Sequence, residues 1–174
     1  MKVYDGSQST DDEQTAEPER IKVGIAEYKT TTDDAVLTTS GLGSCIGVGI
    51  YDEVSGVAGL VHVMLPTADD IDDGNRAKFA DSGVEALVEA LEAAGGSRRS
   101  MRAKIAGGSD MLDFSESGSS IGARNAKQVR ATLEEFGIPL EGEDVGGDHG
   151  RSLKLDAGTG DLVVKSANAE STTL

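Results

Sequence analysis

Apolar and polar residues alternate along the first third of the chain, and this two-residue period predicts β-strands. Residues 21–28 and 35–39 each form one such segment. Residues 45–65 predict a β-hairpin, because two apolar runs flank the turn signal at residues 52–56. This part of the chain is therefore expected to contribute strands to a sheet.

The period lengthens to three or four residues in the middle of the chain, as expected for amphipathic helices. The first set ends at the stop signal Gly95-Gly96 and comprises Ala77, Ala80, Val84, Leu87, Val88 and Leu91. The second set comprises Ala126, Val129, Leu133 and Phe136, and Gly137 and Pro139 follow it. Two helices are therefore predicted, one on each side of a short strand at residues 104–106.

Two more strands are predicted near the C-terminus, at residues 151–155 and 162–165, on either side of a turn signal at residues 158–160. Predicted strands thus outnumber helices, and hairpins are frequent. The fold class expected from this pattern is α+β, with mixed, largely antiparallel β-sheets and helices packed outside them.

The two ends of the chain lack this patterning. Residues 1–20 are polar and without periodicity, and they are predicted to form a disordered acidic tail. Residues 166–174 are predicted to form a flexible C-terminal tail. Residues 21–165 are expected to form a single domain, and a chain of 174 residues is long enough to bury a substantial core.

The charge balance narrows the classes of function. The chain has 31 acidic and 16 basic residues, and a formal net charge of -15 argues against nucleic acid or an anionic membrane as a partner. Aromatic residues make up 3% of the sequence, and this acidic composition predicts a protein of a halophilic archaeon. The sequence shows no secretory signal and no apolar run of about 20 residues, so we expect a cytoplasmic protein without membrane insertion.

The only cysteine, Cys45, lies near one of the two histidines, His62, within the predicted hairpin. With a four-residue loop at residues 52–55, Tyr51 would pair with Gly56 and Cys45 with His62, whose Cβ atoms would be about 5 Å apart on one face. A loop longer by one residue would place them on opposite faces. In the predicted register, a thiolate and an imidazolium would stabilise each other at neutral pH, as in a thiol hydrolase.

Structural interpretations of these residues stay open. A lone cysteine in an apolar strand is often a small buried hydrophobic residue, and a lone histidine is often a core residue with satisfied hydrogen bonds. Gly47 and Gly49 lie on the face of Cys45. They would leave room either for a substrate or for packing against another strand.

Other segments carry less specific signals. Gly41-Leu-Gly43 lacks the last glycine and the following helix of a phosphate-binding loop. The acidic clusters at residues 33–34 and 69–73 lack the ligand spacing of a calcium loop, and we interpret them as solvated loops. His149 lies in a glycine-rich turn, at best near the rim of a site. The sequence contains no cluster of cysteines and histidines, so no metal and no cofactor is expected.

Five separated segments form a further pattern, in a consistent order between residues 21 and 165. They are Thr39-x-Gly41-Leu-Gly-Ser-Cys45, His62-Val-Met-Leu-Pro66, Lys104-Ile-Ala-Gly-Gly108, Ile121-Gly-Ala-Arg-Asn125 and Glu143-Asp-Val-Gly-Gly147. Together they resemble the chemoreceptor glutamine deamidase family, CheD, and the match is far more specific than one short motif. The resemblance implies a layered α/β fold, the CheD-like cysteine hydrolase fold.

The resemblance also implies a reaction. In this family a cysteine, a histidine and a threonine hydrolyse side-chain amides of receptor glutamines, and some members also hydrolyse receptor methyl esters. Cys45 would then be the nucleophile, His62 the base and later the acid, and Thr39 the hydroxyl that orients the histidine. Backbone N–H groups from Gly43 to Cys45 are the expected oxyanion hole. Ser44 would either add a hydrogen bond or satisfy the local backbone. The expected enzyme is a protein-glutamine glutaminase.

The partners implied by the resemblance are methyl-accepting chemoreceptors and a CheC-type phosphatase. Relatives often carry an aromatic residue at the position of Leu112, in a loop that serves either partner docking or capping of the sheet. The alternative to the enzyme is a regulatory binding module for the phosphatase, with little or no catalysis. The presence of Thr39, Cys45 and His62 together favours the enzyme, and a monomer is expected.

Overall fold

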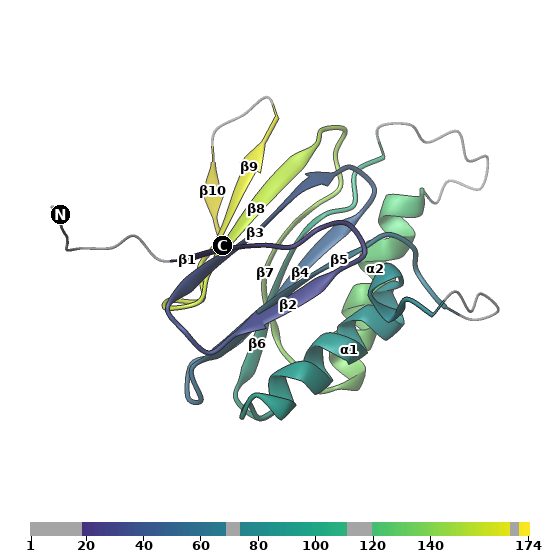
Figure 1. The fold of residues 1–174 in the computed structure, drawn as a ribbon. Coiled ribbons are helices and arrows are strands. Elements are labelled where there is room, and N and C mark those ends of the chain that lie inside the picture. Colours follow the sequence, from purple (N-terminus) through teal and green to yellow (C-terminus); the bar gives the residue numbers. More distant parts are fainter. Residues whose placement is uncertain (1–18, 69–73, 111–119, 168–170) are drawn as a thin grey trace, which may run out of the picture.

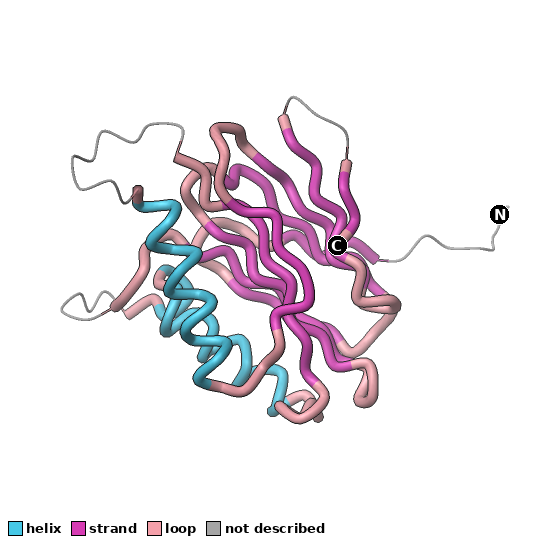
Figure 2. Tube along the Cα trace, turned by 180° about the vertical axis from the view of Figure 1, so that it is seen from behind, coloured by secondary structure: helices cyan, strands magenta, loops and turns pink. Residues whose placement is uncertain are grey.

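The computed structural model describes residues 19–68, 74–110, 120–167 and 171–174. Two β-sheets pack face to face, and two helices cover the outer face of one of them, so the fold has three layers (Figure 1). Seen from behind, both helices lie on the same side of the sheets (Figure 2). This arrangement confirms the α+β class with helices packed outside the sheets.

The sheet remote from the helices contains five strands in the order β1-β3-β8-β9-β10. Their bounds are Glu19–Lys22 for β1, Ala35–Leu42 for β3, Arg151–Asp156 for β8, Leu162–Ser166 for β9 and Thr172–Thr173 for β10. β1 runs parallel to β3, and the other neighbouring pairs are antiparallel.

The sheet beneath the helices contains five strands in the order β2-β5-β4-β6-β7. Their bounds are Tyr28–Thr31 for β2, Ile46–Asp52 for β4, Val57–Val63 for β5, Met101–Gly107 for β6 and Leu140–Val145 for β7. β6 and β7 are parallel, and the other neighbouring pairs are antiparallel. Both sheets are therefore mixed and largely antiparallel, as the sequence predicted.

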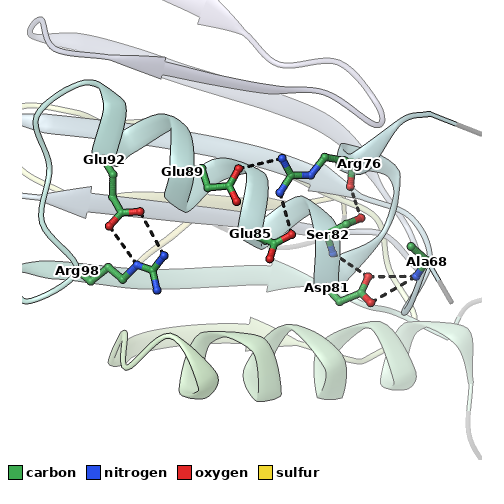
Figure 3. Close-up of polar contacts among 8 residues, drawn as sticks. All are labelled: Ala68, Arg76, Asp81, Ser82, Glu85, Glu89, Glu92 and Arg98. Carbon is green, nitrogen blue, oxygen red and sulfur yellow. Dashed lines mark hydrogen bonds and ion pairs between the residues drawn. The ribbon is translucent and has the colours of Figure 1, made fainter. Parts of the chain in front are cut away.

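The two predicted helices are present as α1, Ala80–Ala93, and α2, Ile121–Glu135, and the short 3-10 helix η1, Arg76–Lys78, precedes α1. The outer face of α1 carries ion pairs between Arg76 and both Glu85 and Glu89, and between Arg98 and Glu92 (Figure 3). These side chains are exposed, so their pairs contribute little to stability. Burial of the apolar face of α1 therefore holds the helix on the sheet.

Strand β4 separates two hydrophobic cores. Its apolar residues Ile46, Val48 and Ile50 belong to the core under the helices. Its other face meets the second sheet, where a Cβ on Gly47 would lie 2.4 Å from Leu153 Cδ1, and one on Gly49 would lie 3.3 Å from Leu155 Cδ2. Leucine side chains of β8 thus fill the space beside these glycines. The interpretation of the glycines as packing positions is the one that the structure supports.

The N-terminal boundary differs from the prediction. Residues 21–28 do not form one strand, because β1 and β2 belong to different sheets and are joined by a turn in which Ala26 has a φ of 59°. Of the predicted disordered tail, residues 1–18 lie outside the described residues, whereas Glu19 and Arg20 belong to β1. The folded part therefore begins two residues earlier than predicted.

The predicted flexible tail at the C-terminus is wrong for its last residues. β10 pairs with β9, and the N–H of Leu174 donates to the carbonyl of Leu162 at 2.8 Å. The buried Lys104 of β6 donates through Nζ to the carbonyls of Gly160 and Leu174, both at 2.9 Å. The C-terminus is thereby tied to both sheets. Residues 168–170 lie outside the described residues.

Candidate active site

His62 lies in β5 and Cys45 directly precedes β4, but the register of this hairpin differs from the prediction. Gly47 pairs with His62, and Asp52 pairs with Val57. The loop occupies residues 53–56, because Gly56 has a φ of 71° and its N–H donates to the Asp52 carbonyl. The two-residue shift preserves the shared face. Cys45 and His62 are therefore diagonal neighbours rather than direct partners.

His62 is fully buried and is held from the opposite sheet. Its Nδ1 lies 2.8 Å from the Oγ1 of Thr39, a hydrogen bond that joins β5 to β3 across the interface between the sheets. Its Nε2 is buried and has no hydrogen-bond partner among the described residues. When Thr39 accepts the proton of Nδ1, Nε2 carries a free lone pair. The predicted orienting contact of Thr39 is thus present, and it leaves Nε2 available as a base.

The protonation states of Cys45 and His62 differ from the predicted ion pair. Burial lowers the pKa of His62 to about 4. Burial also raises the pKa of the Cys45 thiol, against an opposite effect of its own backbone N–H. Each charged form is penalised by desolvation, so thiol and imidazole are both neutral at neutral pH. The thiol proton would therefore move to His62 during attack rather than before it.

The backbone around Cys45 is fixed by three successive hydrogen bonds. The carbonyl of Gly43 accepts from the N–H of Ser109 at 2.9 Å. The carbonyl of Ser44 accepts from Nδ2 of Asn125 at 2.9 Å. The carbonyl of Cys45 accepts from the N–H of Gly108 at 2.8 Å. Among the described residues, the N–H of Ser44 has no acceptor and the N–H of Cys45 meets only the sulfur of its own side chain, so both donors are available to bind an oxyanion.

These hydrogen bonds form because the backbone around Cys45 packs closely against the loop after β6, and that loop against the start of α2. A Cβ on Gly107 would lie 2.2 Å from the Cys45 carbonyl oxygen, and one on Gly122 would lie 2.4 Å from the Ser109 carbonyl oxygen. The loop after β6 and the start of α2 can therefore approach only because these residues are glycines. The carbonyl of Gly107 also accepts from Nη1 of the buried Arg151, at 3.2 Å.

Ser109 and Asn125 are the site residues that sequence reasoning missed. Asn125 closes one of the five resembling segments and Ser109 directly follows another, but neither residue had a predicted role. Both are buried, at 1% and 0% exposure. Their contacts to the Cys45 segment span more than 60 residues of sequence, so no local pattern reports them.

His149, the segment from Gly41 to Gly43 and Leu112 complete the predicted candidates. Nδ1 of His149 is 3.9 Å from a carboxylate oxygen of Asp148, next to it in sequence. Gly41 belongs to β3 and Gly43 lies between β3 and β4, so the chain after this segment leads into a strand. Residues 69–73 and Leu112 lie outside the described residues. Within the described ranges, no three His, Cys, Asp or Glu side chains gather as a metal site would require, and no helix could cross a membrane.

Comparison with known proteins places the chain among named relatives. The family model "CheD chemotactic sensory transduction" matches residues 64–166. A "Probable chemoreceptor glutamine deamidase CheD" of Haloarcula marismortui is 70% identical over 174 residues, which cover 100% of both chains. A protein of the same name from Natronomonas pharaonis is 51% identical over 157 residues, 90% of this chain and 93% of its own. Both of these relatives are proteins of halophilic archaea, in line with the acidic composition.

A solved structure gives a weaker match. The hypothetical protein YfiH of Bacillus licheniformis has a TM-score of 0.46 and 17% identity, over 67% of this chain and 49% of that one. The family model covers more than half of the chain but begins after His62. The Haloarcula relative aligns along the whole chain, the segments of Thr39, Cys45 and His62 included. On this evidence, the chain belongs to the CheD family.

Proposed function

We propose that this protein is a chemoreceptor glutamine deamidase that uses Cys45 as its nucleophile. The observation that carries the proposal is the arrangement of His62. Thr39 fixes Nδ1 of the ring, while Nε2 has no partner within the described part of the chain. His62 and Cys45 both face the second sheet. An imidazole held in this way is suited to accept the proton of a nearby thiol.

The reaction begins with neutral groups. The Sγ atom of Cys45 forms a bond to the Cδ carbonyl carbon of a substrate glutamine, and the thiol proton passes to Nε2 of His62. The carbonyl oxygen becomes an oxyanion, which the available N–H groups of Ser44 and Cys45 would bind. The imidazolium then gives its proton to the nitrogen, the C–N bond breaks, and ammonia leaves a thioester.

Hydrolysis of the thioester completes the cycle. A water molecule gives one proton to Nε2 and attacks the carbonyl carbon, and the C–S bond breaks as the sulfur regains a proton. The products are a glutamate side chain and the original thiol. A glutamate methyl ester would pass through the same thioester with methanol as the leaving group, so receptor methylesterase activity is part of the proposal.

The proposed setting is the cytoplasm, and the proposed substrates are methyl-accepting chemoreceptors. The relatives' name supports this class of substrate, because it denotes a chemoreceptor glutamine deamidase. A CheC-type phosphatase partner and a monomeric state stay predictions. The loop around Leu112, on which the phosphatase prediction depended, lies outside the described residues.

Peptide mass spectrometry tests the proposal. A cytoplasmic fragment of a chemoreceptor from the same organism is incubated in high salt with the wild type or with Cys45→Ala. We expect specific glutamines to become glutamates with the wild type alone, and a methylated fragment to release methanol in the same pattern. Conversion by both proteins, or by neither while both are folded, would refute a cysteine-dependent deamidase.

A further inference from the structure

Three buried polar side-chain atoms in the described part of the chain have no hydrogen-bond partner. They are Nε2 of His62, Oγ of Ser109 and Oδ1 of Asn125. Native proteins satisfy nearly all such atoms, so each exception calls for a reason. All three residues belong to, or directly contact, the segments around Cys45. The proposed base accounts for His62, but the proposed function gives Asn125 no role.

Asn125 lies in the first turns of α2, on the helix side of the sheet. Its Nδ2 donates to two carbonyl oxygens, those of Ser44 and Met64, both at 2.9 Å. Both N–H bonds of the amide are thus used, and an inverted amide would place Oδ1 against two acceptors. The side chain is therefore locked in one orientation between the segment of the nucleophile and the end of β5.

The contact with Ser44 also determines where the N–H of Cys45 points. The Ser44 carbonyl and the Cys45 N–H belong to one planar peptide, and in a trans peptide they point in opposite directions. With the carbonyl held toward α2, the N–H points to the other side of the sheet. That side contains the partly buried Cys45 side chain and His62. The effect of this N–H on the thiol pKa agrees with its closeness to Sγ.

We propose that Asn125 is a positioning residue that holds the Ser44–Cys45 peptide so that the N–H of Cys45 serves as the main oxyanion donor. This inference rests on the proposed deamidase function and adds a residue to it. Asn125 acts through the backbone and does not touch the substrate. Because the carbonyls of Gly43 and Cys45 are held by backbone donors of Ser109 and Gly108, the Ser44 carbonyl is the one of the three that depends on a side chain.

The test compares Asn125→Ala and Asn125→Asp with Thr132→Val. Thr132 is a matched control, since it is a buried polar residue of α2 whose hydroxyl bonds within the helix, to the Gln128 carbonyl at 2.9 Å. For both Asn125 variants we expect kcat of receptor deamidation to fall about 100-fold, as for loss of an oxyanion donor, with KM within about twofold. Alkylation of Cys45 by iodoacetamide forms no oxyanion, so its rate should stay within about twofold of the wild type. Thr132→Val should match the wild type in all three measurements.

A purely structural role would give another result. If deamidation and alkylation fall together, or if kcat is unchanged in folded Asn125 variants, the proposal is wrong. A second measurement uses only the wild type, in case the variants do not fold. A peptide carrying glutamate semialdehyde forms a hemithioacetal with Cys45, and its oxygen should shift the Cys45 amide proton downfield in NMR spectra. Formation of the adduct without this shift would overturn the proposal.

Failure of the inference and failure of the proposed function are distinguishable. If the wild type deamidates no receptor fragment, the proposed function fails. The adduct still reports whether the N–H of Cys45 binds an oxyanion. If the wild type is active and the Asn125 variants keep its kcat, the function stands and the inference fails.

Discussion

Polar groups are buried at both ends of strand β4, but only at one end are all their hydrogen bonds formed. At one end, the buried carboxylate of Asp52 accepts hydrogen bonds from the N–H groups of Ser55 and Ser97, at 3.1 and 2.8 Å. At the other end, His62 and Asn125 each keep a buried polar atom without a partner. The satisfied end joins a turn to a loop, which is a structural role. The unsatisfied end retains binding capacity, which is what a reaction site requires.

Hollow space alone would not have located the candidate site, because the largest of the described pockets, of about 590 Å³, lies between α2 and the start of β7 and not beside Cys45. A pocket of about 220 Å³ lies at the Asp52 end, lined by Asp33, Asp34, Tyr51, Glu53 and neighbouring residues. The lining of this pocket is acidic. None of the three buried side-chain atoms that lack a hydrogen-bond partner in the described part of the chain belongs to it. In this protein, unsatisfied hydrogen-bonding groups locate the candidate chemistry better than hollow space does.

The largest expected effect is on catalysis at the unsatisfied end. His62→Gln removes the base while keeping a polar side chain of similar size, so deamidation should fall about 1,000-fold, within the range for general base catalysis. Steady-state assays with a receptor fragment measure the loss. The control is Glu53→Ala, an exposed position at the far end of β4. A His62→Gln variant with wild-type activity would show that the end of β4 near His62 is not the catalytic one.

The buried imidazole should also link stability to pH. The folded pKa of His62 is about 4, against 6.5 in the unfolded chain, so between these values the unfolded chain binds a proton that the folded protein does not. The free energy of unfolding therefore rises with pH across this window, and about 3 kcal/mol is lost as the pH falls from 6.5 to 4. Denaturant unfolding of the wild type and of His62→Gln measures it. Carboxylates titrate in both proteins, so the difference between the two curves isolates His62, and identical curves would contradict its burial as a neutral group.

A third effect belongs to the satisfied end. Burial alone would raise the pKa of Asp52, but hydrogen bonds from Ser97, Ser100 and Ser55 together outweigh it and lower the pKa. Asp52→Ala leaves those backbone donors without their acceptor and should lower the free energy of unfolding by about 2 kcal/mol. Deamidation per folded molecule should be unchanged. Loss of kcat at temperatures where the variant is folded would show that the two ends are coupled.

The sequence predicted the layers of the fold better than the contacts of the site. Alternation and helical spacing identified the hairpin and both helices, because each follows from burial of one face. The register was wrong by two residues, since Gly56 takes a left-handed turn position that moves the loop along the chain. The strand predicted at 21–28 divides because Ala26 turns the chain into the other sheet. Asn125 and Ser109 contact the segment around Cys45 because glycines allow the backbones to approach each other closely. Such contacts between distant parts of the chain leave no periodic pattern in the sequence.

The smallest expected effect concerns the hydrogen bond between the sheets. Thr39→Val keeps the volume of the side chain but removes the oxygen that lies 2.8 Å from Nδ1 of His62. The ring would then lose its orienting contact and its preferred tautomer, while Nε2 would remain able to accept a proton, so we expect deamidation to fall about 10-fold.

Thr38→Val provides the matched control, because the neighbouring threonine of β3 points to the other face of the sheet. In Thr39→Val, the rate of Cys45 alkylation should fall together with kcat, since the base itself is misplaced. This pattern differs from that expected for the Asn125 variants, in which alkylation is preserved. If Thr39→Val reduced kcat without slowing alkylation, Thr39 would act on the oxyanion rather than on His62. The role proposed here for Thr39, orientation of the base, would then be wrong.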